Sequence, residues 1–229
     1  SLKLIGEFAF VSLSLASNAF YIPASVESIG KGAFIRYRSE AFIVDEANKD
    51  YCSVDGVLFT KDKAELVAYP YGKTQIEYTV PDGVKRIGEY AFSKIDNIYK
   101  INLPESLESI GGYAFYGIYS IRRIDVPAGV TVIEPYTFSH CADLETISLH
   151  DGVTTIGRGA FAESEELALN GLPGALETIA DSAFYHCYVG DNIIIPAGVK
   201  SIGAHAFERI YHYDTEFYFL GKTPPAIPV

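Results

Sequence analysis

Phenylalanine recurs in this chain at an unbroken spacing of 23 residues, at Phe92, Phe115, Phe138, Phe161, Phe184 and Phe207. Two earlier copies contain Phe10 and Phe34, and an isoleucine stands five residues before each of these eight phenylalanines. A fixed period of 20 to 50 residues is the signature of a solenoid, whose repeats bury their apolar side chains against their neighbours. The spacing therefore predicts one β-rich solenoid over residues 1–229 with about eight stacked coils.

A single copy shows how each coil is built. Ile121, Ile124 and Val126 have the spacing of a short strand, and the following Pro127–Gly129 segment is typical of a type I turn. Ile133 then belongs to a second extended segment. The repeated Ile-Gly pairs are expected because each coil needs the same bend. Coils with a polar or small residue at a core position, at Asn170 and Gly190, are expected to be less stable.

Two segments depart from the period. Phe34 and Phe92 are 58 residues apart, so this interval contains 35 additional residues, and residues 45–78 are predicted to form a hairpin insertion. Its β-rich runs 56–60 and 65–69 flank a short polar link. At the other end, residues 208–229 are predicted to form a terminal coil with a strand at 216–221. The proline-rich segment 223–226 is expected not to continue the strand ladder.

Charge and composition exclude several functions. A formal net charge of −11 disfavours binding to nucleic acid or to an anionic membrane. No apolar run approaches the roughly 20 residues of a membrane-spanning helix. The sequence begins at Ser1, within a repeat, and contains no methionine, which suggests a fragment or a processed form. Cys141 and Cys187 stand two repeats apart, roughly 9–10 Å at strand spacing, and are expected to be buried thiols rather than a disulfide.

The repeats resemble the BspA-type leucine-rich repeats of bacterial surface proteins. The resemblance rests on residues 103–111 running into Ala114-Phe115, on the insertion 53–59 with Tyr69-Pro70, and on the ending 221–225. It implies a leucine-rich-repeat solenoid that is secreted or anchored at the cell surface and serves adhesion or recognition. No asparagine ladder is expected, and the family supplies no catalytic motif.

Signals for catalysis or cofactor binding are weak, so no enzyme activity, cofactor or metal site is predicted. His140 and His186 occupy the same repeat position but two coils apart, roughly 10 Å, which is too far for both to bind one zinc ion. The acidic run from Asp45 to Asp55 lacks the residue order of a known calcium loop and is interpreted as a solvated loop.

Tyrosine supplies the first set of candidate partner-binding residues. Tyr90, Tyr113 and Tyr136 occupy equivalent positions two residues before the repeat phenylalanine and are expected to stack in a file. A second file, four residues after the phenylalanine, contains Tyr119, Tyr188 and Tyr211. Tyrosine offers a large contact area for proteins or sugars at low entropic cost. Packing between coils is the alternative explanation.

The second candidate set lies on the strands, where residues between the buried positions should point outward. It consists of Tyr99, Lys100, Asn102, Arg122, Arg123, Asp125 and Glu145. Lys100, Arg122 and Arg123 form a basic island in an acidic protein, unless they pair locally with Asp125 and Glu145. The sequence thus predicts a monomeric, non-enzymatic module that recognises protein partners. The alternatives are a glycan-binding protein and a structural stalk that displays another domain.

Overall fold

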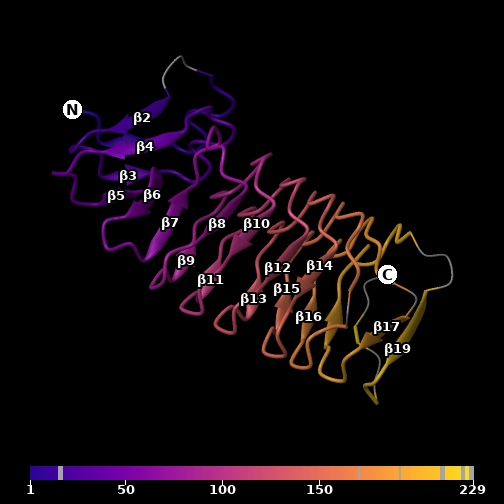
Figure 1. Cartoon of the computed structure of the whole chain (residues 1–229). Coiled ribbons are helices and arrows are strands. Elements are labelled where there is room, and N and C mark those ends of the chain that lie inside the picture. The colour runs from indigo at the N-terminus through magenta and orange to yellow at the C-terminus, as the bar shows by residue number, and fades with distance from the viewer. Residues whose placement is uncertain (15–17, 170, 191, 212–214, 223–224, 227–229) are drawn as a thin grey trace.

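The computed structural model describes residues 1–14, 18–169, 171–190, 192–211, 215–222 and 225–226. The chain forms a solenoid of about nine turns, and no described residue is helical. Figure 1 shows the coils stacked in single file, with the two termini at opposite ends of the stack. The predicted leucine-rich-repeat solenoid is confirmed. Asn170, where the sequence suggests a weaker coil, lies outside the described residues.

Two four-stranded parallel sheets run along the regular part of the stack. The first contains β8 (Glu77–Thr79), β10 (Lys100–Asn102), β12 (Arg123–Asp125) and β14 (Thr146–Ser148). The second contains β13 (Val132–Ile133), β15 (Thr155–Ile156), β16 (Thr178–Ile179) and β18 (Ser201–Ile202). Partner residues in neighbouring coils are 23 positions apart, as in Lys100 opposite Arg123 and Ile133 opposite Ile156. Each repeat position therefore forms a column along the solenoid.

The insertion continues the second face of the stack by a mixed five-stranded sheet. Its strands are β5 (Tyr51–Val54), β6 (Val57–Thr60), β7 (Glu65–Ala68), β9 (Arg86–Ile87) and β11 (Ser109–Ile110). The expected hairpin is β6 with β7, which pair antiparallel, and β5 adds a further antiparallel strand that the sequence pattern missed. Because β7 pairs parallel with β9, the insertion joins the regular array through backbone hydrogen bonds.

Two-stranded parallel pairs close the ends of the stack. At the N-terminal end β1 (Leu4–Ile5) pairs with β3 (Ser28–Ile29), and β2 (Ala19–Ile22) pairs with β4 (Ala41–Val44). At the other end β17 (Asn192–Ile195) pairs with β19 (Glu216–Phe219). The expectation that the ladder stops in the proline-rich tail is wrong at Ala226. This residue bridges Ser201; its N–H donates to the carbonyl of Lys200, because alanine retains the donor that proline lacks, and its carbonyl accepts the N–H of Ile202.

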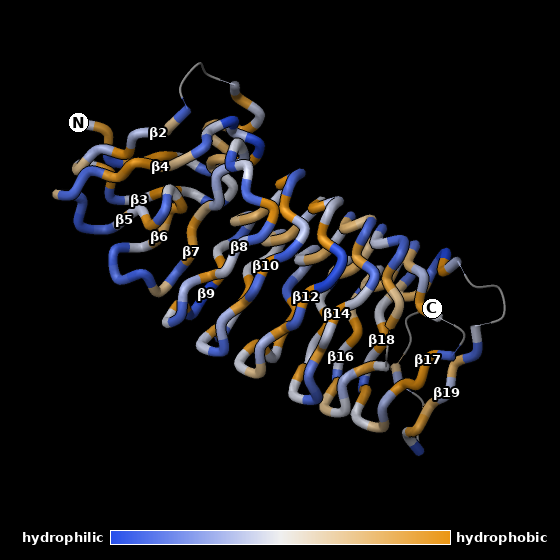
Figure 2. Tube along the Cα trace, in the orientation of Figure 1, coloured by the Kyte–Doolittle hydropathy of each residue, from blue (hydrophilic) through white to orange (hydrophobic). Residues whose placement is uncertain are grey.

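The repeat phenylalanines form a continuous stack inside the array. Consecutive rings from Phe92 to Phe207 are nearly parallel, with centroids 5.2–5.6 Å apart. Tyr69 of the insertion extends this stack, 5.2 Å from Phe92. Phe10 and Phe34 belong to a second core at the N-terminal end, which also contains Phe42. Hydropathy alternates along the coils accordingly (Figure 2), so the chain has two packed cores that the insertion joins.

The turns around each phenylalanine of the regular array use left-handed backbone two residues before and two residues after it. In the central coil Tyr136 and His140 both have φ of 57°, and each donates its N–H to a carbonyl of the following coil. The Ile-Gly glycines have a different role from the predicted bend, since Gly30 and Gly203 do not have positive φ. A Cβ at these positions would lie 2.4 Å and 2.3 Å from backbone nitrogens of the preceding coil. These glycines allow close coil-to-coil approach.

Candidate functional site

The candidate strand residues lie on one exposed face, here called the strand face. It comprises the outward residues of β8, β10, β12 and β14 and the residue before each strand. Its columns are 76-99-122-145, 77-100-123-146 and 79-102-125-148, as the parallel register fixes them. The inward column between them anchors the sheet to the core through the buried Ile101, Ile124 and Ile147 and the partly buried Tyr78. Tyr99 is 55% exposed, and Arg122, Arg123, Asp125 and Glu145 are exposed with it.

Charged residues of the strand face form short ion pairs. Lys100 contacts Glu77 at 2.7 Å, and Asn102 donates to the same carboxylate at 3.0 Å. These two hydrogen bonds hold the pKa of Glu77 below its usual value. The geometry thus brings together Lys100 and Asn102 with an acidic partner, Glu77, that sequence reasoning did not include. The repeat period could have identified Glu77, because this residue stands 23 positions before Lys100.

The two arginines pair in different directions. Arg122 reaches Glu145 of the next coil at 3.5 Å, whereas Arg123 donates from Nη2 and Nε to Asp125 of its own strand, at 2.9 Å and 3.2 Å. The hydrogen bonds with Asp125 raise the pKa of Arg123. Exposed pairs of this kind contribute roughly 0–1 kcal/mol. The charges can therefore exchange their present partners for an incoming one at little cost.

Large apolar side chains flank this charged centre. Ile76 and Tyr99 are adjacent in one column and are 64% and 55% exposed. Tyr21 and Ile43 are exposed on β2 and β4 at the N-terminal end, and Ile194 and Tyr218 are exposed on β17 and β19 at the other. A surface of this composition, with exposed aromatic and aliphatic groups beside polar groups, suits contact with another protein.

The first tyrosine file is stacked as predicted. Tyr90, Tyr113 and Tyr136 have ring centroids 4.7 Å and 4.8 Å apart. Phe8 packs edge-on against Tyr90 at the near end, and a Cβ on Gly159 would touch the Tyr136 ring at the far end. Burial raises the pKa values of Tyr90 and Tyr113. Neighbouring groups therefore cover the ring faces, and this file presents mainly ring edges to solvent.

The second tyrosine file is interrupted. Tyr119 is separated from Tyr188 by two coils, which place Ala142 and Glu165 in that column. Lys94 lies beside Tyr119, with its ammonium 3.2 Å from the hydroxyl and 5.2 Å from the ring centroid. The strand face and the first tyrosine file remain the larger continuous candidates.

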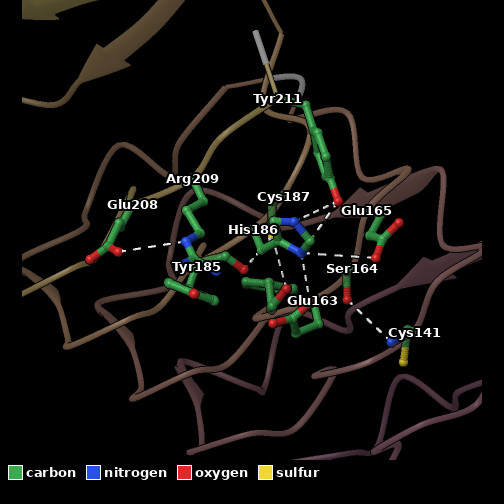
Figure 3. Close-up of polar contacts among 11 residues, drawn as sticks. Cys141, Glu163, Ser164, Glu165, Tyr185, His186, Cys187, Glu208, Arg209 and Tyr211 are labelled. Carbon is green, nitrogen blue, oxygen red and sulfur yellow. Dashed lines mark hydrogen bonds and ion pairs between the residues drawn. The ribbon is translucent and has the colours of Figure 1, made fainter.

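Glu163 and Glu165 are two further polar residues that sequence reasoning missed. Glu163 occupies the column between His140 and His186, and it contacts His186 Nδ1 at 2.7 Å (Figure 3). Glu165 approaches the same nitrogen at 3.9 Å, from the neighbouring column. His140 does not join this cluster through a hydrogen bond; its ring packs edge-on against Tyr116, and burial, together with Lys94, lowers its pKa. The sequence analysis considered only His140 and His186, and it therefore missed Glu163, which stands one repeat from each of them.

The acidic insertion loop is organised by Asn48. Asn48 is 1% exposed, and its side-chain amide donates to the carbonyls of Pro23 and Val26. Its side-chain oxygen accepts the N–H groups of Asp50 and Tyr51. Asp45 accepts hydrogen bonds from Tyr21 and from the N–H of Ala47, which lower its pKa. These contacts join the insertion to the preceding coil.

The three cysteines should differ in reactivity. Cys141 and Cys187 are fully buried free thiols, and burial raises the pKa of each to about 12. Cys52 is half-buried in β5. Because the thiolate is the reactive species, we expect a thiol reagent near neutral pH to modify only Cys52 in the native protein and all three cysteines after denaturation. Mass spectrometry of the labelled protein checks this; native labelling of Cys141 would contradict the buried core.

Fold and surface together define a leucine-rich-repeat solenoid with an extended polar strand face. The family model for the BspA type leucine rich repeat region matches residues 1–51, 68–189 and 177–217, in six copies. The chain belongs to this family. No curated protein sequence matches the chain.

Solved structures of bacterial proteins are similar over most of the chain. A leucine-rich repeat protein from Eubacterium ventriosum matches with a TM-score of 0.73 and 25% identity, over 91% of this chain and 68% of its own. A leucine rich cell surface protein from Faecalibacterium prausnitzii gives 0.72 and 25%, over 96% and 52%. The pneumococcal vaccine antigen PcpA gives 0.69 and 25%, over 96% and 55%. The chain thus spans about half the length of the last two proteins.

A search for membrane-crossing helices among the described residues found none with the necessary length and apolar character.

Proposed function

We propose that the chain is a non-enzymatic recognition module that binds protein partners, as a monomer, at the cell surface or outside the cell. The carrying observation is the strand face, where four strands in register present charged residues beside exposed Tyr99 and Ile76. Repeat proteins commonly use such extended surfaces for recognition. The cell-surface description of the F. prausnitzii protein supports the proposed location.

The covered tyrosine rings favour protein over glycan partners. Sugars bind aromatic residues by lying on an open ring face, and the Tyr90, Tyr113 and Tyr136 faces pack on one another. The exposed edges of these rings extend the surface available to a protein partner, but they offer no open ring face on which a sugar could lie. Adhesion is the role we propose for this binding, with Arg122, Arg123 and Tyr99 as the principal contacts. Polar contacts to the partner would come from Lys100, Asn102, Asp125 and Glu145.

The test is binding of the purified chain to an array of extracellular-matrix proteins and to an array of glycans. We expect selective protein binding that the double substitution Arg122→Glu/Arg123→Glu weakens by more than about tenfold, since charge reversal places like charges opposite each other. Both arginines are exposed, so the unfolding midpoint should not change. Lys85→Glu/Lys200→Glu is the matched control, because it changes the net charge equally at two exposed residues that lie outside the strand face and pair with a neighbouring glutamate.

Three outcomes would contradict the proposal. Equal loss of binding in Lys85→Glu/Lys200→Glu would indicate a general charge effect. Saccharide binding that Tyr113→Ala abolishes would favour the glycan-binding alternative. An absence of binding on both arrays would favour a structural stalk.

A further inference from the structure

The cluster of Glu163, Glu165 and His186 has the composition and spacing of a metal site. One ligand atom from each residue, an imidazole nitrogen and two carboxylate oxygens, lies within 4.8 Å of the other two. Ligands at about 2.1 Å from a tetrahedral zinc ion are about 3.4 Å apart. The two measured separations from His186 Nδ1, 2.7 Å and 3.9 Å, lie on either side of that value. Small side-chain rotations would therefore bring the three atoms around one ion.

The backbone holds the two inner ligands in place. Glu163 and His186 share one repeat column, and each has a left-handed backbone conformation, with φ of 63° and 56°. Each donates its N–H to a carbonyl of the following coil, at 2.9 Å. Their side chains are only 31% and 27% exposed, while Glu165 is half-exposed at the rim. The two inner ligands are thus held on a hydrogen-bonded backbone, with the more exposed Glu165 beside them.

Tyr211, from a third coil, packs against the imidazole of His186. The Tyr211 hydroxyl lies 2.7 Å from His186 Nε2 and its ring is 4.6 Å from the imidazole (Figure 3). The same hydroxyl also lies 3.3 Å from Nδ1, so Tyr211 contacts both ring nitrogens. This contact holds the imidazole beside the two carboxylates and joins a third coil to the cluster.

We propose that Glu163, Glu165 and His186 form a zinc site, with water at the fourth position. One nitrogen and two oxygen ligands match zinc, whereas calcium and magnesium prefer oxygen ligands alone. The bound ion would connect the coils of Phe161 and Phe184, and Tyr211 would extend the connection to a third coil. This site is separate from the strand face and does not depend on the proposed recognition function.

The test measures zinc binding to the intact chain by isothermal titration calorimetry, with cobalt(II) absorption as a report of the coordination geometry. We expect a single ion per chain and a zinc-dependent increase in the unfolding midpoint. Glu163→Gln and His186→Ala should each weaken binding by more than tenfold, because each removes one of the three ligand atoms. Unfolding midpoints without zinc identify any variant that is merely misfolded.

Two matched controls separate this site from incidental binding. His205→Ala removes a histidine paired with only one carboxylate, that of Glu208, and Cys52→Ala removes the half-buried thiol. Both variants should bind zinc as the unmodified protein does. Wild-type affinity in folded His186→Ala would overturn the proposal, as would an equal loss in His205→Ala. Calcium binding as tight as zinc binding would also overturn it, because it would show that the imidazole contributes no selectivity.

Discussion

Phe138→Asp is expected to unfold the central coils of the solenoid. The Phe138 ring is fully buried between Phe115 and Phe161, with centroids at 5.2 Å and 5.6 Å. Removing a buried phenylalanine alone costs about 3–5 kcal/mol, and an unpaired carboxylate in its place adds a desolvation penalty. The sum approaches the whole stability of a typical domain, about 5–15 kcal/mol.

The effect should spread from the site of the substitution. Because each coil contacts only its neighbours, a broken central coil removes the packing surface from both sides. Urea unfolding followed by near-ultraviolet circular dichroism, which reports the stacked aromatic rings, measures the loss. Tyr99→Asp is the control, since it makes the same type of change at an exposed position. Cooperative unfolding of Phe138→Asp at the wild-type midpoint would contradict the buried phenylalanine stack.

The second large effect is expected at Asn48. Its side chain makes four hydrogen bonds to backbone groups of Pro23, Val26, Asp50 and Tyr51, at 2.8–3.0 Å. Asn48→Ala leaves these groups without their partner, and each unsatisfied buried group costs about 1–3 kcal/mol. Water reaches some of them at the protein surface, so we expect a total loss of about 3–5 kcal/mol.

This loss should be confined to the N-terminal core. That core contains Val26 and is packed separately from the phenylalanine stack. Hydrogen exchange should show faster exchange at the amides of Asp50 and Tyr51 in Asn48→Ala, while protection around Phe138 persists. Lys49→Ala, at the exposed neighbouring position, should change neither region. Unchanged protection of Tyr51 in Asn48→Ala would show that the amide does not hold this loop.

Much of the fold could be predicted because the period itself encodes the geometry. Residues 23 positions apart occupy equivalent places in consecutive coils, so the phenylalanine stack and the file of Tyr90, Tyr113 and Tyr136 follow from counting along the chain. The same reasoning gives the outward positions of the strand face. In contrast, β5 lies inside the insertion, where no period applies, and its pairing depends on the tertiary path of the chain.

The sites were less predictable, since they depend on contacts between different columns. The repeat specifies that Glu163 and His186 are neighbours, but only the folded turn brings Glu165 and Tyr211 from another column to the same imidazole. Likewise, the choice of Asp125 rather than Glu145 as the partner of Arg123 is a matter of side-chain rotamer.

The amino-acid sequence alone therefore fixes the solenoid, its period and its buried columns, because a regular translation repeats the same burial at each coil. Only the tertiary structure determines what joins those columns. The Asn48 contacts and the carboxylate pair around His186 require the curvature of each turn and the path of the insertion. The repeat spacing predicts neither set of contacts, because it identifies neighbours within one column along the stack but not contacts between different columns.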